Sequence, residues 1–126
     1  MLSVGFAGAD YGMLFNIGDV PLEQASEHRA ARALLEYTPP TKEPDVRVQQ
    51  RQAHYGIELG GFNFKNRLSA RVSNTYLLRS ISPERSDIAL AFRVVREDTD
   101  GSFILVFKVL KKFPTPDLER TKAENN

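Results

Sequence analysis

Residues 88–111 read IALAFRVVREDTDGSFILVFKVLK, and this stretch decides the fold class. Apolar side chains alternate on both sides of residues 98–102, which contain the Asp-Gly pair typical of a tight hairpin turn. The sequence therefore predicts two antiparallel strands, over 88–97 and 103–111. A two-residue Asp-Gly loop sets the expected cross-strand pairs, which are Phe92 with Val109, Val94 with Phe107 and Arg93 with Lys108.

Both faces of this expected hairpin carry apolar side chains. Phe92 and Val94 belong to one face. The reverse face holds Ala91, Val95, Ile104, Val106 and Leu110. Strands that are apolar on both sides are usually covered on both, here by a helix or by a second subunit. We therefore expect the second apolar face to be a contact surface.

Upstream of the hairpin, period-two patterns indicate further strands. The segment 75–81 predicts one strand, followed by a loop over 82–87. Apolar and polar residues also alternate over 46–72. The apolar positions change from odd to even residue numbers across Gly60-Gly61, as at a turn or bulge. The whole region predicts a sheet of about five antiparallel strands.

The N-terminal third has a different pattern. Alternating apolar residues over 2–6 and 13–17 predict a short hairpin or two strands. Alanines and leucines at helical spacing predict a helix over about 22–36. Residues 38–44 contain three prolines and predict an extended connector.

These elements predict an α+β fold in which one helix packs on a curved antiparallel sheet. A hotdog-like arrangement and a cone or barrel fit the pattern equally. The 126 residues, 41% hydrophobic and 26% charged, suffice for one domain, which we place at 1–116. Residues 117–126 are polar and are expected to form a frayed tail.

Composition excludes several classes of function. The chain has no cysteine, which excludes disulfides, thiolate metal sites and thiol catalysis. His28 and His54 are the two histidines and form no ligand motif, so neither a metal nor another cofactor is expected. No segment reads as a signal peptide or a membrane span, and we expect a cytoplasmic protein.

Arg79 is the most informative charged residue. It shares a strand face with Leu77 and Ile81, so its guanidinium would lie on an apolar side and need an acceptor. Asp87, across the predicted loop, is the expected partner. A structural ion pair is one interpretation. The other is an anion-binding pocket, in which Arg79 and Asp87 join His54 and Tyr55 as ligand-binding residues of a small-molecule site or a small enzyme.

A basic stretch with aromatic residues suggests a second kind of partner. Residues 46–79 contain six basic groups and one acidic group, interleaved with aromatic rings. Such a composition suits a stacking platform for single-stranded nucleic acid. The residues that would form it are Arg67, Arg71, Phe62 and Phe64. No specific motif supports this alternative, and we expect nucleic acid not to be the partner.

The distribution of charge favours self-association. Residues 1–45 hold three basic and seven acidic groups, whereas residues 46–126 hold fourteen and nine. The two parts can therefore attract each other between copies. Since no catalytic set is visible, the sequence favours a non-enzymatic interaction or ligand-binding module that forms a homodimer or higher oligomer, or docks in a larger assembly.

Overall fold

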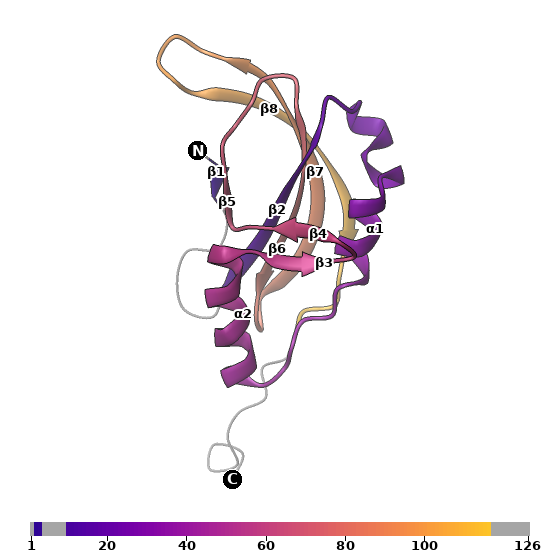
Figure 1. Ribbon diagram of the computed structural model, residues 1–126, viewed down its shortest axis with the longest axis vertical. Helices are drawn as coiled ribbons and strands as arrows, with labels where there is room; N and C mark the ends of the chain where they lie inside the picture. The colour runs from indigo at the N-terminus through magenta and orange to yellow at the C-terminus, as the bar shows by residue number, and fades with distance from the viewer. Residues whose placement is uncertain (1, 4–9, 117–126) are drawn as a thin grey trace.

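The computed structural model describes residues 2–3 and 10–116 of the chain (Figure 1). A curved antiparallel sheet of four strands, in the order β2-β6-β7-β8, forms the centre of the molecule. Its strands are β2 (Tyr11–Gly18), β6 (Thr75–Ser82), β7 (Ser86–Glu97) and β8 (Phe103–Lys112). The sheet is not closed into a barrel, because β2 and β8 do not pair with each other.

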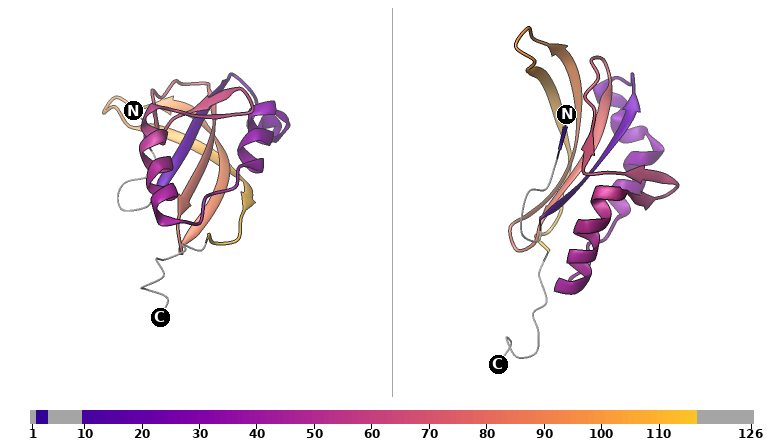
Figure 2. Two further views of the ribbon diagram at one scale, coloured as in Figure 1. Left: turned by 60° about the horizontal axis from the view of Figure 1, so that its bottom comes forward. Right: turned by 60° about the vertical axis from the view of Figure 1, so that its left-hand side comes forward.

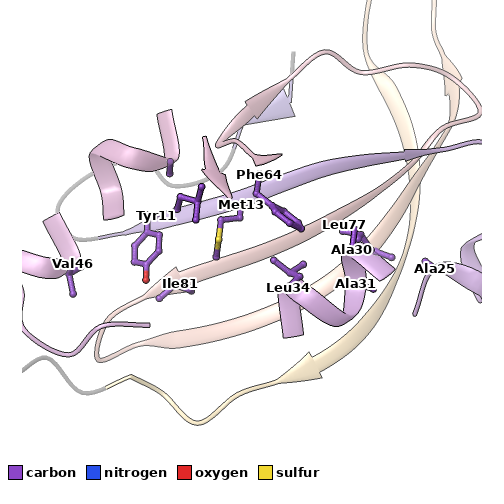
Figure 3. Packing of buried hydrophobic residues seen from close by; sticks show 13 residues of the cluster. Tyr11, Met13, Ala25, Ala30, Ala31, Leu34, Val46, Phe64, Leu77 and Ile81 are labelled. Atoms are coloured by element: carbon purple, nitrogen blue, oxygen red, sulfur yellow. The ribbon is translucent and has the colours of Figure 1, made fainter. Parts of the chain in front are cut away.

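Helices cover one face of this sheet (Figure 2). They are a 3-10 helix (Leu22–Glu27), α1 (Arg29–Glu36) and α2 (Glu43–Tyr55), followed by the hairpin of β3 (Ile57–Leu59) and β4 (Phe62–Phe64). Apolar side chains from both layers meet in the main core, where Met13, Leu34 and Phe64 are fully buried (Figure 3). Burial of this apolar surface holds the two layers together.

The opposite face of the sheet is covered only in part. The short strands β1 (Leu2–Ser3) and β5 (Arg67–Leu68) pair with each other and place Leu2 and Leu68 against a smaller core. In this core the ring of Tyr76 stacks on that of Phe92, with centroids 5.2 Å apart. Tyr76 also donates a hydrogen bond to the Ser69 carbonyl, which ties the β5–β6 connection to the sheet.

The expected helix over 22–36 is two helices. His28 has an extended backbone, with φ −69° and ψ 142°, which interrupts the helical path. Its Nδ1 accepts a hydrogen bond from the backbone N–H of Ala30 and so caps α1. The predicted helix is divided into two because His28, in the middle of the predicted range, caps the start of α1.

The strand expected from residue 46 onward is wrong, because residues 43–55 form α2. Pro44 occupies the first turn, where a missing N–H costs nothing, and Gly56 ends the helix with φ 127°. The buried side chains Val46 and Ala53 are seven residues apart, which places them on one helical face, while Val48 is exposed. The alternation of Val46 and Val48 thus had no structural meaning.

Two expected pairings also differ. Of the two N-terminal alternatives, the two separate strands are present and the hairpin is wrong: β2 pairs with β6 and β1 with β5, while residues 4–6 of the expected first strand lie outside the described residues. The β7–β8 hairpin is present, but Phe92 lies opposite Phe107 and Val94 opposite Leu105. The Asp98 N–H donates to the Ser102 carbonyl across a longer turn, and two register shifts follow along the strands, so the two-residue loop was the wrong assumption.

The β7–β8 hairpin extends beyond the remaining strands as an arm, which is visible at the top of Figure 1. Within the described ranges 2–3 and 10–116, no helix has the length and apolarity needed to cross a membrane.

Candidate functional site

Arg79 lies at the centre of the interface between the sheet and the helices. It points from β6 toward α1, together with Leu77 and Ile81, and is 1% exposed. Its Nε and Nη2 donate to the two carboxylate oxygens of Asp87, at 2.9 and 2.7 Å. Asp87 lies opposite Ile81 on the neighbouring strand β7, on the same face of the sheet. The ion pair expected from the sequence is therefore present and bidentate.

Two carbonyl groups and two aromatic rings complete the surroundings of the guanidinium. Nη1 donates to the carbonyls of Leu34 and Tyr37, at the end of α1, where helix carbonyls lack intrahelical partners. The rings of Phe113 and Tyr37 lie 3.8 and 5.3 Å from the guanidinium carbon. Four N–H groups of Arg79 thus have protein acceptors, which favours the structural interpretation over an anion-binding one.

A cleft opens beside this ion pair, between the α1–α2 connector and the chain that follows β8. Its volume is about 430 Å³, within the range of small-molecule pockets. Lys111, Phe113 and Pro39 contribute to its wall, with Arg79 and Asp87 at its base. A second hollow of about 380 Å³, lined by Tyr37 and Asp45 among others, lies on the α2 side of the connector.

A chain of hydrogen bonds links the sheet to α2 near these hollows. The Tyr37 hydroxyl donates to Gln49 Oε1 at 3.0 Å. Its single proton is thereby used, so the Tyr11 hydroxyl, 2.9 Å away, must donate to Tyr37. Burial is the main factor that raises the pKa of both phenols, and the hydrogen bond donated to Tyr37 raises that of Tyr11 further.

These raised pKa values predict a loss of stability in alkaline solution. A phenol that holds its proton more tightly when folded stabilises the protein below its unfolded pKa near 10.0, and this contribution declines as the pH rises above that value. We expect ultraviolet titration to show Tyr11 and Tyr37 ionising later than free tyrosine. In Tyr11→Phe one late ionisation should disappear. Ionisation of both phenols near 10.0 in the folded protein would contradict the prediction.

His54 and Tyr55 are not part of the Arg79 cleft. They lie in the last turn of α2, where their rings meet edge to face at 5.1 Å and Tyr55 is 78% exposed. Neither contributes to the lining of the cleft at Arg79. The four residues named together from the sequence therefore occupy two places, because the segment that carries His54 and Tyr55 is a helix rather than a strand of the sheet.

The residues of the nucleic-acid alternative also separate. Phe64 is fully buried and its ring packs 5.2 Å from that of Phe15, so it has no face available for a base. Phe62 is half-buried against the same core. Arg67 and Arg71 are exposed, on β5 and the turn that follows it. The arrangement provides exposed positive charge without the stacking rings.

Most of the exposed large apolar side chains of the described residues lie on β8. This strand exposes Ile104, Leu105, Val106, Phe107 and Val109 on both faces of the sheet, and Phe107 is 67% exposed. We call these five residues the β8 surface. Their strand is an edge of the sheet, so its outer N–H and C=O groups face no other strand of the part that the structure describes.

The two ends of β8 carry opposite charges. Asp98 and Asp100 lie in the turn before it, and Lys111 and Lys112 lie at its end. Hydrogen bonds from the Ser102 hydroxyl and N–H hold the pKa of Asp100 below its usual value, so this carboxylate is ionised at neutral pH.

No protein-family model, no curated protein and no solved structure matches this chain.

Sequence reasoning missed several contacts of the site. It named neither the Leu34 and Tyr37 carbonyls nor the Phe113 ring beside Arg79. The one available signal was chemical: a buried guanidinium needs about five acceptors or ring faces, and one aspartate supplies two of them. The sequence pattern indicated that both faces of the hairpin carry apolar side chains. It did not indicate that β8 is the edge strand of the sheet.

Proposed function

We propose that this chain is a non-enzymatic interaction module that self-associates through the β8 surface. The observation that carries the proposal is a ten-residue edge strand with exposed apolar side chains on both faces. Proteins that remain monomeric usually protect such edges with charges, prolines, bulges or a covering segment. Between Phe103 and Leu110 the single charged residue is Lys108, and the register shift on β8 lies near its end at Leu110, so the first part of β8 has little of this protection.

The energetic gain would come mainly from Phe107. Full burial of a large apolar side chain stabilises a complex by roughly 1.5–3 kcal/mol, and a two-fold dimer gains this contribution twice. Backbone hydrogen bonds along the strand would fix the direction of pairing. The cost of association reduces the net gain, so we expect a dissociation constant of about 1–100 µM.

The Phe107→Asp variant should be monomeric at concentrations where the unmodified chain is dimeric. A buried carboxylate without a partner would weaken association by about 100-fold or more. Sedimentation velocity over a concentration series measures this directly. Tyr55→Asp is the matched control, because it places the same charge at an exposed aromatic position on α2. A wild-type chain that stays monomeric up to about 300 µM would refute the proposal.

The cleft beside Arg79 supports a second candidate, the binding of a small molecule. Its volume of about 430 Å³ and its ammonium group from Lys111 would suit a compact anion. Native mass spectrometry of the purified chain distinguishes the two functions. A dimer without added mass supports self-association, whereas a monomer that retains a reproducible extra mass, lost in Lys111→Met, supports ligand binding.

A further inference from the structure

We propose that a second copy of the chain pairs with β8 antiparallel, about a two-fold axis at Val106, so that the two four-stranded sheets form one continuous sheet. This inference rests on the proposed self-association and specifies its geometry. It follows from three features of the described residues: the accessible β8 edge of the four-stranded sheet, the distribution of charge at the two ends of β8, and the order of its side chains.

The opposite edge of the sheet is already occupied. The Leu14 N–H donates to the Lys65 carbonyl at 2.7 Å, and the Lys65 N–H donates back at 3.1 Å. Gln50 on α2 donates to the Asp10 carbonyl just before β2. These contacts occupy the middle of β2 and the residue before it, which disfavours pairing of β8 with β2 of another copy. Pairing of β8 with β8 is favoured, and it closes as a dimer that does not grow into a filament.

Charge determines the direction of pairing. In a parallel arrangement the acidic turn of one copy would lie beside the acidic turn of the other, and the lysines beside the lysines. Asp98 is already paired with Arg96 of its own chain, and an antiparallel arrangement places Asp100 of each copy beside Lys111 and Lys112 of the other. Opposite charges facing each other across two strands stabilise the pairing, and like charges destabilise it.

The register follows from the same residues. With Val106 opposite Val106 of the second copy, the turn that carries Asp100 lies beside the end of β8 that carries Lys112 of that copy, twice in the dimer. Leu105 then faces Phe107 of the second copy, which pairs the most exposed ring of the β8 surface with an aliphatic side chain. An axis at Lys108 would bring two ammonium groups together. Axes at Leu105 or Phe107 would remove the pairing of Phe107 with Leu105 of the second copy.

Disulfide scanning tests this geometry, because the chain has no cysteine of its own. Single cysteines are introduced in turn at positions 104, 105, 106, 107 and 108, and each variant is oxidised at a concentration where the unmodified chain is dimeric. Val106→Cys should cross-link at least tenfold faster than the others. At the neighbouring positions the two Cα atoms would be about 8 Å apart, beyond the reach of a disulfide.

The outcomes separate the two proposals. If the wild-type chain is dimeric and the fastest cross-link lies elsewhere than 106, or none forms, the two-fold geometry is refuted and self-association stands. If the wild-type chain is monomeric in sedimentation, both proposals are refuted. Val106 is exposed, so its replacement by cysteine should not disturb folding, and circular dichroism of the variant confirms this.

A charge swap provides an independent measurement. Asp100→Lys and Lys112→Glu should each raise the dissociation constant of their own homodimer by about two- to tenfold. When the two variants are mixed, both cross-copy pairs join opposite charges again, one of them with reversed sign, and native mass spectrometry should show more mixed dimer than the statistical share. A statistical mixture would refute the assigned pairing of Asp100 with Lys112.

Discussion

Arg79→Met is expected to lower the free energy of unfolding by about 3–5 kcal/mol. Methionine keeps much of the length of the side chain but leaves the Asp87 carboxylate buried without a cation. It also removes the donor shared by the Leu34 and Tyr37 carbonyls at the end of α1. Urea unfolding followed by circular dichroism, at one fixed protein concentration, measures the loss.

Two further variants show whether the loss of stability comes from the unpaired buried charge. Arg47→Met removes the exposed ion pair with Glu43 and should cost less than about 1 kcal/mol. Arg79→Met combined with Asp87→Leu should recover part of the loss, because no unpaired charge then remains in the core. A loss below about 1 kcal/mol in Arg79→Met alone would show that the ion pair is not needed for stability.

Phe64→Ala is expected to cost about 3–5 kcal/mol, the usual range for truncation of a buried phenylalanine. The ring is fully buried and contacts Phe15, and β4 brings it against the sheet (Figure 3). Tyr55→Ala is the matched control and should stay within about 0.5 kcal/mol, because Tyr55 is largely exposed. Equal effects of the two substitutions would contradict the assigned core.

This expectation also changes how nucleic-acid binding should be tested. A loss of binding in Phe64→Ala would report unfolding and not the loss of a stacking contact. Arg67→Ala is the informative substitution, since Arg67 is exposed. Binding that it weakens, with a steep dependence on salt, would revive this alternative.

The sequence predicted the parts of the fold that depend on local rules. The Gly60-Gly61 pair indicated the turn between β3 and β4, where both glycines have positive φ. Alternation indicated β6 and the arm. The chemistry of a buried guanidinium identified Asp87 as the partner of Arg79. Each of these inferences used residues that are close in the chain.

Contacts between distant segments could not be predicted in this way. Leu34 and Phe113 reach Arg79 from segments more than 30 residues away on either side, and nothing in their own neighbourhoods marks them. The helix α2 was missed because Val46 and Val48 happen to alternate. The order of strands is also a tertiary property, so the edge position of β8 could not be read from its own residues.

The segment that follows β8 has a consequence for the order in which the protein matures. The Phe113 N–H donates to the Asp87 carbonyl, and the Glu84 N–H donates to the Pro116 carbonyl, so residues 113–116 close over the ion pair. On the ribosome these residues emerge after every other element of the described structure. A nascent chain that lacks them has the Arg79 guanidinium open to water on one side, so the ion pair reaches its final burial only after residues 113–116 have left the ribosome.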